Sequence, residues 1–268
     1  MNSGRIFAES YDWEYRNKKD DLEFYQKLAG RLGGPILECG CGTGRIALAM
    51  AEKGSPVVGV DIDPYSLQIM KKKIKKINLG SRCSAICDDI TKLDANAALS
   101  QRMFKMILFS FDIFSYLFPS TRGLYSTKED VQKVQRSVLE WSKRHLDKNG
   151  VVVIDVFGLG EHIEPYVLRH HYTMTDNQAG IVRSCFSAFQ PDQDPDFFQL
   201  HFFIEEIKNG AMRKFHRMLR GYRQDIIELK NLAESVGLEI TEVYDNISFR
   251  PCKLKPNIYG AVIIFKLP

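Results

Sequence analysis

The chain has 268 residues, of which 44% are hydrophobic and 26% are charged, and its formal net charge is +4. A chain of this length and composition can bury a full hydrophobic core, which excludes a disordered or fibrous protein. The weak positive charge does not by itself indicate a nucleic-acid partner, and no apolar run approaches the roughly 18 residues that a membrane span needs.

Cysteine usage and the first residues indicate where the protein works. Six cysteines in a chain of this length are typical of a reducing compartment, and there is no C-x-x-C pair and no H-x-x-x-H pattern. The N-terminus has no apolar signal segment. We therefore expect a cytoplasmic protein without a metal site and without a membrane partner.

Residues 1–34 open the chain with aromatic residues among acids, and an amphipathic helical pattern follows. Tyr11 and Tyr15 have two interpretations. They either attach a helix to the core, as aromatic residues commonly do, or they close over a cationic ligand by cation–π attraction.

Residues 36–63 have the pattern of a parallel βαβ unit. A short apolar run ends at Glu38, glycines alternate with small residues, a small-residue helix covers residues 46–53, and a second apolar run ends at Asp61. Glycines at such a turn let the backbone approach a ligand closely. Asp61 stands where a carboxylate can accept hydrogen bonds from both hydroxyls of a ribose. The stretch therefore predicts a cofactor that carries a nucleoside.

The spacing of the glycines distinguishes between cofactors. A dinucleotide turn reads G-x-G-x-x-G, whereas this turn reads E-x-G-x-G-x-G with a CGTG centre and a GVDID ending. It resembles the class I S-adenosylmethionine-dependent methyltransferases, in which the loop meets the methionine end of the cofactor. The resemblance implies a Rossmann-like α/β fold with a seven-stranded, mostly parallel sheet and a reversed last strand. It also implies cofactor contacts from Tyr11, Tyr15, Glu38, Gly40, Gly42, Gly44, Asp61, Ile62, Asp89, Ile90 and Phe109.

The third strand and the helix before it complete this half of the sheet. Asp63 and Pro64 begin a helix whose lysines, residues 71–76, we interpret as a solvated face and not as a polyanion-binding patch. Residues 82–86 form the third strand, and the acid after it contacts the adenine in the family. Asp89 with Ile90 fits that place best, with Asp88 as the alternative one residue earlier.

Residues 106–111 are apolar except for Ser110, which is typical of a strand buried on both faces. The FDIFSYL stretch that follows lies at the carboxyl edge of the sheet and resembles glycine and aminosugar N-methyltransferases. The sugar enzymes have a histidine where Tyr116 stands, and a tyrosine with a pKa near 10 is a poor base at neutral pH. We therefore expect Tyr116 to orient the acceptor, while Asp112 or water takes the proton.

Later segments complete the fold. Capping signals at Ser126 and Thr127 start a helix, and residues 151–156 form strand five, in which Asp155 either faces the substrate or caps a turn. A divalent cation between Asp112 and Asp155 is a minority alternative. Strand-like runs separated by turn signals predict an antiparallel β insertion over residues 161–222. It contains or adjoins five histidines, one of which could supply the missing base: His162, His170, His171, His201 and His216.

We expect residues 1–34 to form a helical lid, 35–160 the cofactor-binding core, 161–222 an insertion that walls the acceptor pocket or joins two copies, and 223–268 the rest of the core sheet. The expected activity is methyl transfer to a nitrogen or oxygen of a small molecule. The alternatives are an RNA or protein methyltransferase of the same fold, a nicotinamide-dependent oxidoreductase, and a cofactor-binding protein without catalysis.

Overall fold

The computed structural model describes residues 3–119, 126–157, 164–245, 248–254 and 260–268. Its main sheet has seven strands in the order β10-β11-β5-β4-β1-β2-β3. The strands are β1 (Ile36–Cys39), β2 (Val57–Asp61), β3 (Cys83–Cys87), β4 (Phe104–Phe109), β5 (Leu146–Phe157), β10 (Glu239–Asp245) and β11 (Gly260–Lys266). β11 runs antiparallel to both of its neighbours, whereas β1 to β5 pair in parallel. The predicted sheet with a reversed last strand is confirmed.

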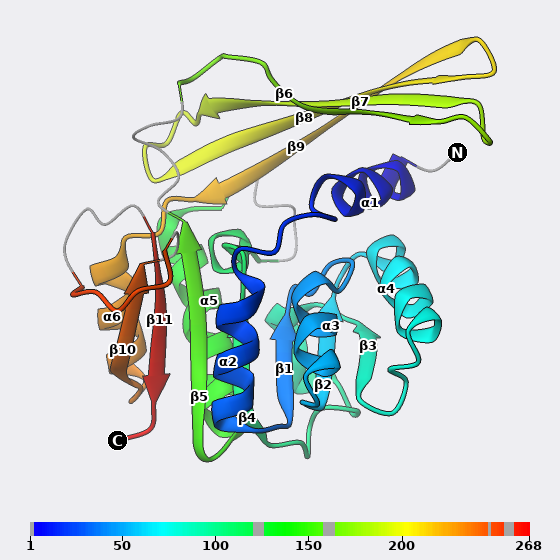
Figure 1. The fold of residues 1–268 in the computed structure, drawn as a ribbon. Helices are drawn as coiled ribbons and strands as arrows, with labels where there is room; N and C mark the ends of the chain where they lie inside the picture. Colours follow the sequence, from blue (N-terminus) through cyan, green and yellow to red (C-terminus); the bar gives the residue numbers. More distant parts are fainter. Residues whose placement is uncertain (1–2, 120–125, 158–163, 246–247, 255–259) are drawn as a thin grey trace.

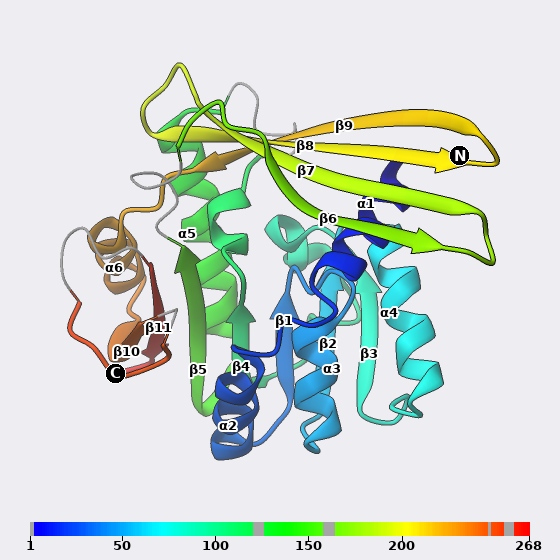
Figure 2. The ribbon, with the colours of Figure 1, turned by 45° about the horizontal axis from the view of Figure 1, so that its top comes forward.

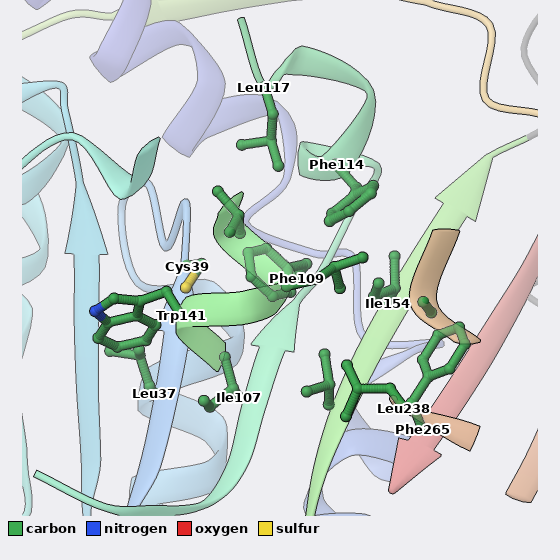
Figure 3. Packing of buried hydrophobic residues seen from close by; sticks show 14 of the residues in the cluster. Leu37, Cys39, Ile107, Phe109, Phe114, Leu117, Trp141, Ile154, Leu238 and Phe265 are labelled. Carbon is green, nitrogen blue, oxygen red and sulfur yellow. The ribbon is translucent and has the colours of Figure 1, made fainter. Parts of the chain in front are cut away.

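Helices cover both faces of this sheet, because its central strands are apolar on both sides (Figure 1). One face carries α2 (Leu22–Leu32), α3 (Arg45–Glu52) and α4 (Pro64–Lys76). The other carries η1 (Ile90–Ala95), α5 (Lys128–Arg144) and α6 (Ile226–Ser235). Figure 3 shows the second core, where Trp141 of α5 lies against the Leu37 and Cys39 side of the sheet. The two cores fix the strands, and therefore the tips from which the site is built.

A second sheet of four antiparallel strands spans the edge of the first sheet where β1, β4 and β5 end (Figures 1 and 2). It consists of β6 (Arg169–Asp176), β7 (Ile181–Pro191), β8 (Phe197–Lys208) and β9 (Ala211–Tyr222). α1 (Ser3–Glu14) lies beneath it, and Ile6 of α1 is buried against Cys185 and Ile204. The sheet and α1 together roof the carboxyl edge of the core.

Two local features differ from the sequence expectation. β5 begins at Leu146 and not at residue 151, because the Lys-Asn-Gly stretch is absorbed as an irregularity in the β4–β5 pairing, with Asn149 at a φ of +60°. The N-terminal segment divides into two helices with different roles. α1 belongs to the roof, whereas α2 packs beside α3 on the core.

Among the described helices, none combines the length and the apolar character that a membrane span needs.

Candidate active site

Asp61 at the tip of β2 organises the glycine loop that follows β1. Its Oδ2 accepts a hydrogen bond of 2.7 Å from the amide of Gly42, and its Oδ1 accepts one of 2.8 Å from the amide of Asp63. Burial raises the pKa of this carboxyl above its ordinary value. A carboxylate has about four acceptor positions, so two remain for hydroxyl groups of a ligand.

The three glycines of the loop serve different purposes. A Cβ on Gly40 would lie 2.3 Å from Cγ1 of Ile113, and one on Gly44 would lie 2.6 Å from Cγ of Met70, so both are required by packing inside the protein. A Cβ on Gly42 would meet nothing closer than the Tyr11 ring at 3.8 Å. Gly42 is therefore the glycine of the three whose backbone has open space next to it, on the side of Tyr11.

Glu38 contributes a buried acceptor to the same place. Its Oε1 accepts a hydrogen bond of 2.8 Å from the hydroxyl of Ser110, whereas its Oε2 is buried and has no hydrogen-bond partner among the described residues. Burial raises the pKa of Glu38 to about 7. An acceptor left unpaired in this way is costly unless a bound donor or cation satisfies it.

Aromatic rings at the end of α1, directly after it and in the β4 loop lie in a row next to the glycine loop. The Tyr11 and Tyr15 centroids are 4.7 Å apart, and Tyr15 meets Phe111 edge-on at 5.1 Å. Lys73 of α4 holds this end of α1 in place, because it pairs with Asp12 and also donates a hydrogen bond to the carbonyl of Thr43 in the glycine loop. The Tyr11 ring lies next to Gly42, and both interpretations of Tyr11 and Tyr15 are compatible with this position.

The adenine-side residues predicted from the sequence lie on different surfaces. Ile62 is 68% exposed beside Asp61, which is unusual for a large apolar side chain and leaves a surface for a flat ring. Asp89 accepts hydrogen bonds from the amide and hydroxyl of Thr91, and although partial burial opposes the shift, its hydrogen bonds to Thr91 and Lys92 lower its pKa. Ile90 packs against the core, and Phe109 is fully buried edge-on to Phe114. The Phe109 side chain therefore contacts other buried side chains and is not placed to touch a ligand directly.

Asp112 and Tyr116 lie together beneath the roof. Oδ1 of Asp112 accepts hydrogen bonds from the Ser115 hydroxyl at 2.8 Å and the Phe157 amide at 3.0 Å, while its buried Oδ2 has no partner among the described residues. Burial raises the pKa of Asp112 well above its ordinary value. The Tyr116 ring meets Phe198 of β8 edge-on at 6.1 Å, and burial raises the pKa of its phenol well above 10. Tyr116 is therefore a neutral hydrogen-bond donor at neutral pH, as expected from the sequence.

Asp155 proves more central than sequence reasoning indicated. Its Oδ2 accepts hydrogen bonds from the Tyr25 hydroxyl at 2.8 Å and from the Phe111 amide at 3.1 Å, and burial raises its pKa to about 6. These bonds fix Phe111 and Asp112, both at positive φ, against strand five. The carboxylate thus holds the turn that carries Asp112 and Tyr116.

Arg45, directly after Gly44, connects the glycine loop to the segment before α2 and to Phe111, and we did not predict this from the sequence. Its guanidinium makes a bidentate pair with Asp21 at 2.5 and 2.6 Å and lies 5.3 Å from the centre of the Phe111 ring. The sequence offered one signal for this contact: Arg45 is a charged residue at the first position of the helix that follows the glycine loop.

The described histidines that we considered as bases lie on the second sheet and contact residues of that sheet or of α1. The His201 and His216 rings stack with Nδ1 of one 3.0 Å from Nε2 of the other, His171 contacts Glu14 of α1, and His170 contacts Thr173. His162 lies outside the described residues. The described residues also contain no group of three His, Cys, Asp or Glu side chains that could hold a metal ion.

Comparison with known proteins finds a methyltransferase domain in the first half of the chain. Residues 36–150 match the family model of a methyltransferase domain. The chain is 45% identical over 51 residues to a ubiquinone biosynthesis O-methyltransferase from Bordetella avium. The matched stretch covers 19% of this chain and 21% of that protein. The chain spans less than half the length of the curated relatives it matches.

Solved structures extend the likeness to the whole fold. A sugar N-methyltransferase from Streptoalloteichus has a TM-score of 0.71 at 14% identity, covering 96% of this chain and 92% of that one. An amino pentose methyltransferase from Micromonospora echinaspora, solved with S-adenosylmethionine bound, has a TM-score of 0.65 at 16% identity, covering 96% and 95%. Residues 36–150 match a methyltransferase domain, and the chain has the fold of the class I methyltransferases. S-adenosylmethionine is the cofactor that this domain and fold support.

Three features of this loop are compatible with that cofactor. Asp61 keeps acceptor positions open, Gly42 has open space beside its backbone, and Oε2 of Glu38 has no hydrogen-bond partner among the described residues. Exposed Ile62 adds an apolar surface for the adenine. The nucleoside-bearing cofactor inferred from the sequence thus agrees with the geometry of the loop.

Proposed function

We propose that this methyltransferase transfers a methyl group from S-adenosylmethionine to a nitrogen or oxygen atom of a small molecule. The observation that carries the proposal is the roof over the carboxyl edge. Phe198 of β8 packs on Tyr116, and Ile6 of α1 is buried under the sheet. A roof this close favours a compact acceptor over a polymer. The sugar and amino pentose methyltransferases with the same fold support this acceptor class.

In this proposal the protein positions the acceptor molecule and accepts the proton that the acceptor atom loses. The bound cofactor supplies an activated methyl group with a neutral leaving group, so the alignment of the acceptor provides most of the rate. Tyr116, neutral because it is buried, donates a hydrogen bond that orients the acceptor. Asp112, whose raised pKa suits it to accept a proton, takes the proton through its unpartnered Oδ2. Tyr11 and Tyr15 close over the sulfonium from the side of α1.

The test is a methyl-transfer assay with three separate acceptor pools: a small-molecule cell extract, total RNA, and cell protein. Each pool is incubated with the enzyme and S-adenosylmethionine labelled in the methyl group, and S-adenosylhomocysteine is added in a parallel reaction as inhibitor. We expect label in the small-molecule pool, and we expect Asp112→Asn to lower it. Label only in RNA or protein would overturn the acceptor class, and label in no pool would favour a binding protein without catalysis.

We also propose that two copies associate through the outer face of the second sheet. Val182, Ile207 and Met212 are directly paired across β7, β8 and β9, and they are 37%, 40% and 57% exposed. A row of exposed apolar side chains on a strand surface favours a protein contact. Sedimentation of the wild type and of Ile207→Lys tests this, and a monomeric wild type would refute it.

The cytoplasm is the proposed place of action. Cys39, Cys41, Cys83 and Cys185 are buried as free thiols, which is typical of a reducing compartment.

A further inference from the structure

A cleft of about 350 Å³ opens next to α3, on the face of the main sheet that carries α2, α3 and α4. Its walls are the segment of residues 15–21 between α1 and α2, the outer side of α3, and the C-terminal half of α4. α2, α3 and α4 lie together on this side of the sheet in Figure 1. Among the described residues that line it, none is Glu38, Gly42 or Asp61, so the cleft is separate from the cofactor contacts.

The lining of this cleft is cationic around an apolar floor. The floor comes from Leu22, Leu48, Ala49 and Ile77, and Glu52 is the single acid that lines it. Six basic side chains stand around this floor: Arg16, Lys18, Lys19, Arg45, Lys73 and Lys76.

Three of these cations are neutralised within the protein. Lys18 pairs with Asp20, Arg45 with Asp21, and Lys73 with Asp12. The Arg45 pair joins α3 to the residue before α2, and the Lys73 pair joins α4 to α1, so both stabilise the packing of these helices.

The other three cations have no carboxylate within 4 Å in the part of the chain that the structure describes. They are Arg16, Lys19 and Lys76, and they come from two separated segments. Arg16 is also held in place, because its guanidinium lies 3.8 Å from the centre of the Trp13 ring and donates a hydrogen bond of 2.5 Å to the Trp13 carbonyl. One guanidinium and two ammonium groups around one cleft can together donate to several oxygens of a doubly charged anion.

We propose that this cleft binds a phosphate-bearing small molecule. Arg16, Lys19 and Lys76 meet the phosphate oxygens, and Leu48 and Ile77 carry the ring or chain attached to the phosphate. The volume lies at the lower end of the range of small-molecule sites. The lysines of α4 therefore divide into two sets. Lys76 lines the cleft, whereas Lys71 and Lys72 are exposed to solvent outside it.

The test is calorimetric titration with phenyl phosphate at about 50 mM salt, on protein saturated with S-adenosylhomocysteine. We expect saturable binding that the double variant Lys19→Gln/Lys76→Gln weakens at least tenfold. The matched control Lys71→Gln/Lys72→Gln removes the same charge from α4 outside the cleft and should change the affinity less than twofold. Inorganic phosphate should bind more weakly than phenyl phosphate, because it leaves the apolar floor uncovered.

Three results would overturn the proposal. They are the absence of saturable binding, binding that is seen only when S-adenosylhomocysteine is left out of the titration, and equal weakening by the control variant. The last result would show general attraction to a basic surface. Phenyl phosphate is titrated directly, so none of these results depends on whether methyl transfer to a small molecule is correct.

Discussion

Replacing Asp61 by alanine tests the cofactor site at its most specific point. The substitution removes two acceptor positions that we assign to ribose hydroxyls, and it also leaves the Gly42 and Asp63 amides without their acceptor. Hydrogen bonds to charged groups contribute about 1.5 to 3 kcal/mol each. Because water replaces part of this, we expect a net loss of about 2 to 3 kcal/mol in binding. That loss corresponds to a dissociation constant for S-adenosylhomocysteine that is about 30 to 150 times higher.

The neighbouring acid Asp63 provides the control. Its side chain caps α4 by accepting hydrogen bonds from the amides of Tyr65 and Ser66, so Asp63→Ala removes the same charge two residues away. Loss of such a cap costs about 1 kcal/mol of stability, or a fall in Tm of about 2 to 4 °C. Calorimetry should show affinity within about threefold of the wild type for this variant. If folded Asp61→Ala also bound S-adenosylhomocysteine within threefold, the assignment of the β2 tip to the ribose would be refuted.

Three further predictions follow from the glycine loop, the buried glutamate and the acceptor side. Gly40→Ala should lower stability by about 2 to 3 kcal/mol, since its φ of +72° and the close Ile113 side chain both oppose a Cβ; Gly42→Ala, strained only by its φ of +53°, should lower stability by about 1 kcal/mol and mainly weaken cofactor binding, and equal losses of Tm would contradict this. Glu38 has a pKa of about 7 in the folded protein against an ordinary 4.5, so the folded state holds its proton more tightly and stability falls as pH rises from about 4.5 to 7. Glu38→Gln should reduce that fall in denaturant unfolding at pH 5, 6, 7 and 8, and a slope equal to that of the exposed control Glu52→Gln would refute the cause. Tyr116→Phe should lower kcat/KM about tenfold through one lost hydrogen bond while the affinity for S-adenosylhomocysteine is retained; unchanged kcat/KM would remove its orienting role.

The second sheet could be predicted closely because its turns have local sequence signals. The Lys-Asn-Gly turn places Asn209 at a φ of +51° and Gly210 at +78°, which is the geometry that Asn-Gly favours in a two-residue hairpin. β8 ends at Lys208 and β9 begins at Ala211, directly on either side of this turn. Before strand five a second Lys-Asn-Gly stretch, residues 148–150, continues β5 as an irregularity, so the strand begins at Leu146 and not at the predicted residue 151.

The acceptor side could not be predicted to the same extent, because its geometry depends on contacts between distant residues. Tyr25 and Asp155 are 130 residues apart and meet through one hydrogen bond, so no local pattern could show that Asp155 holds the Phe111 turn. Phe109 ends an apolar strand in which residues on both faces are buried, and sequence alone cannot tell which of them faces a ligand. By contrast, Asp61 and Gly42 were predictable because a strand tip and a tight turn place them directly.

The central claim is that the crevice at the tips of β1 and β2 binds S-adenosylmethionine. Its most direct test is calorimetric titration of the purified wild type with S-adenosylhomocysteine and, separately, with NAD. We predict saturable binding of S-adenosylhomocysteine at one site per chain and no binding of NAD. Binding of NAD without any binding of S-adenosylhomocysteine would contradict the account.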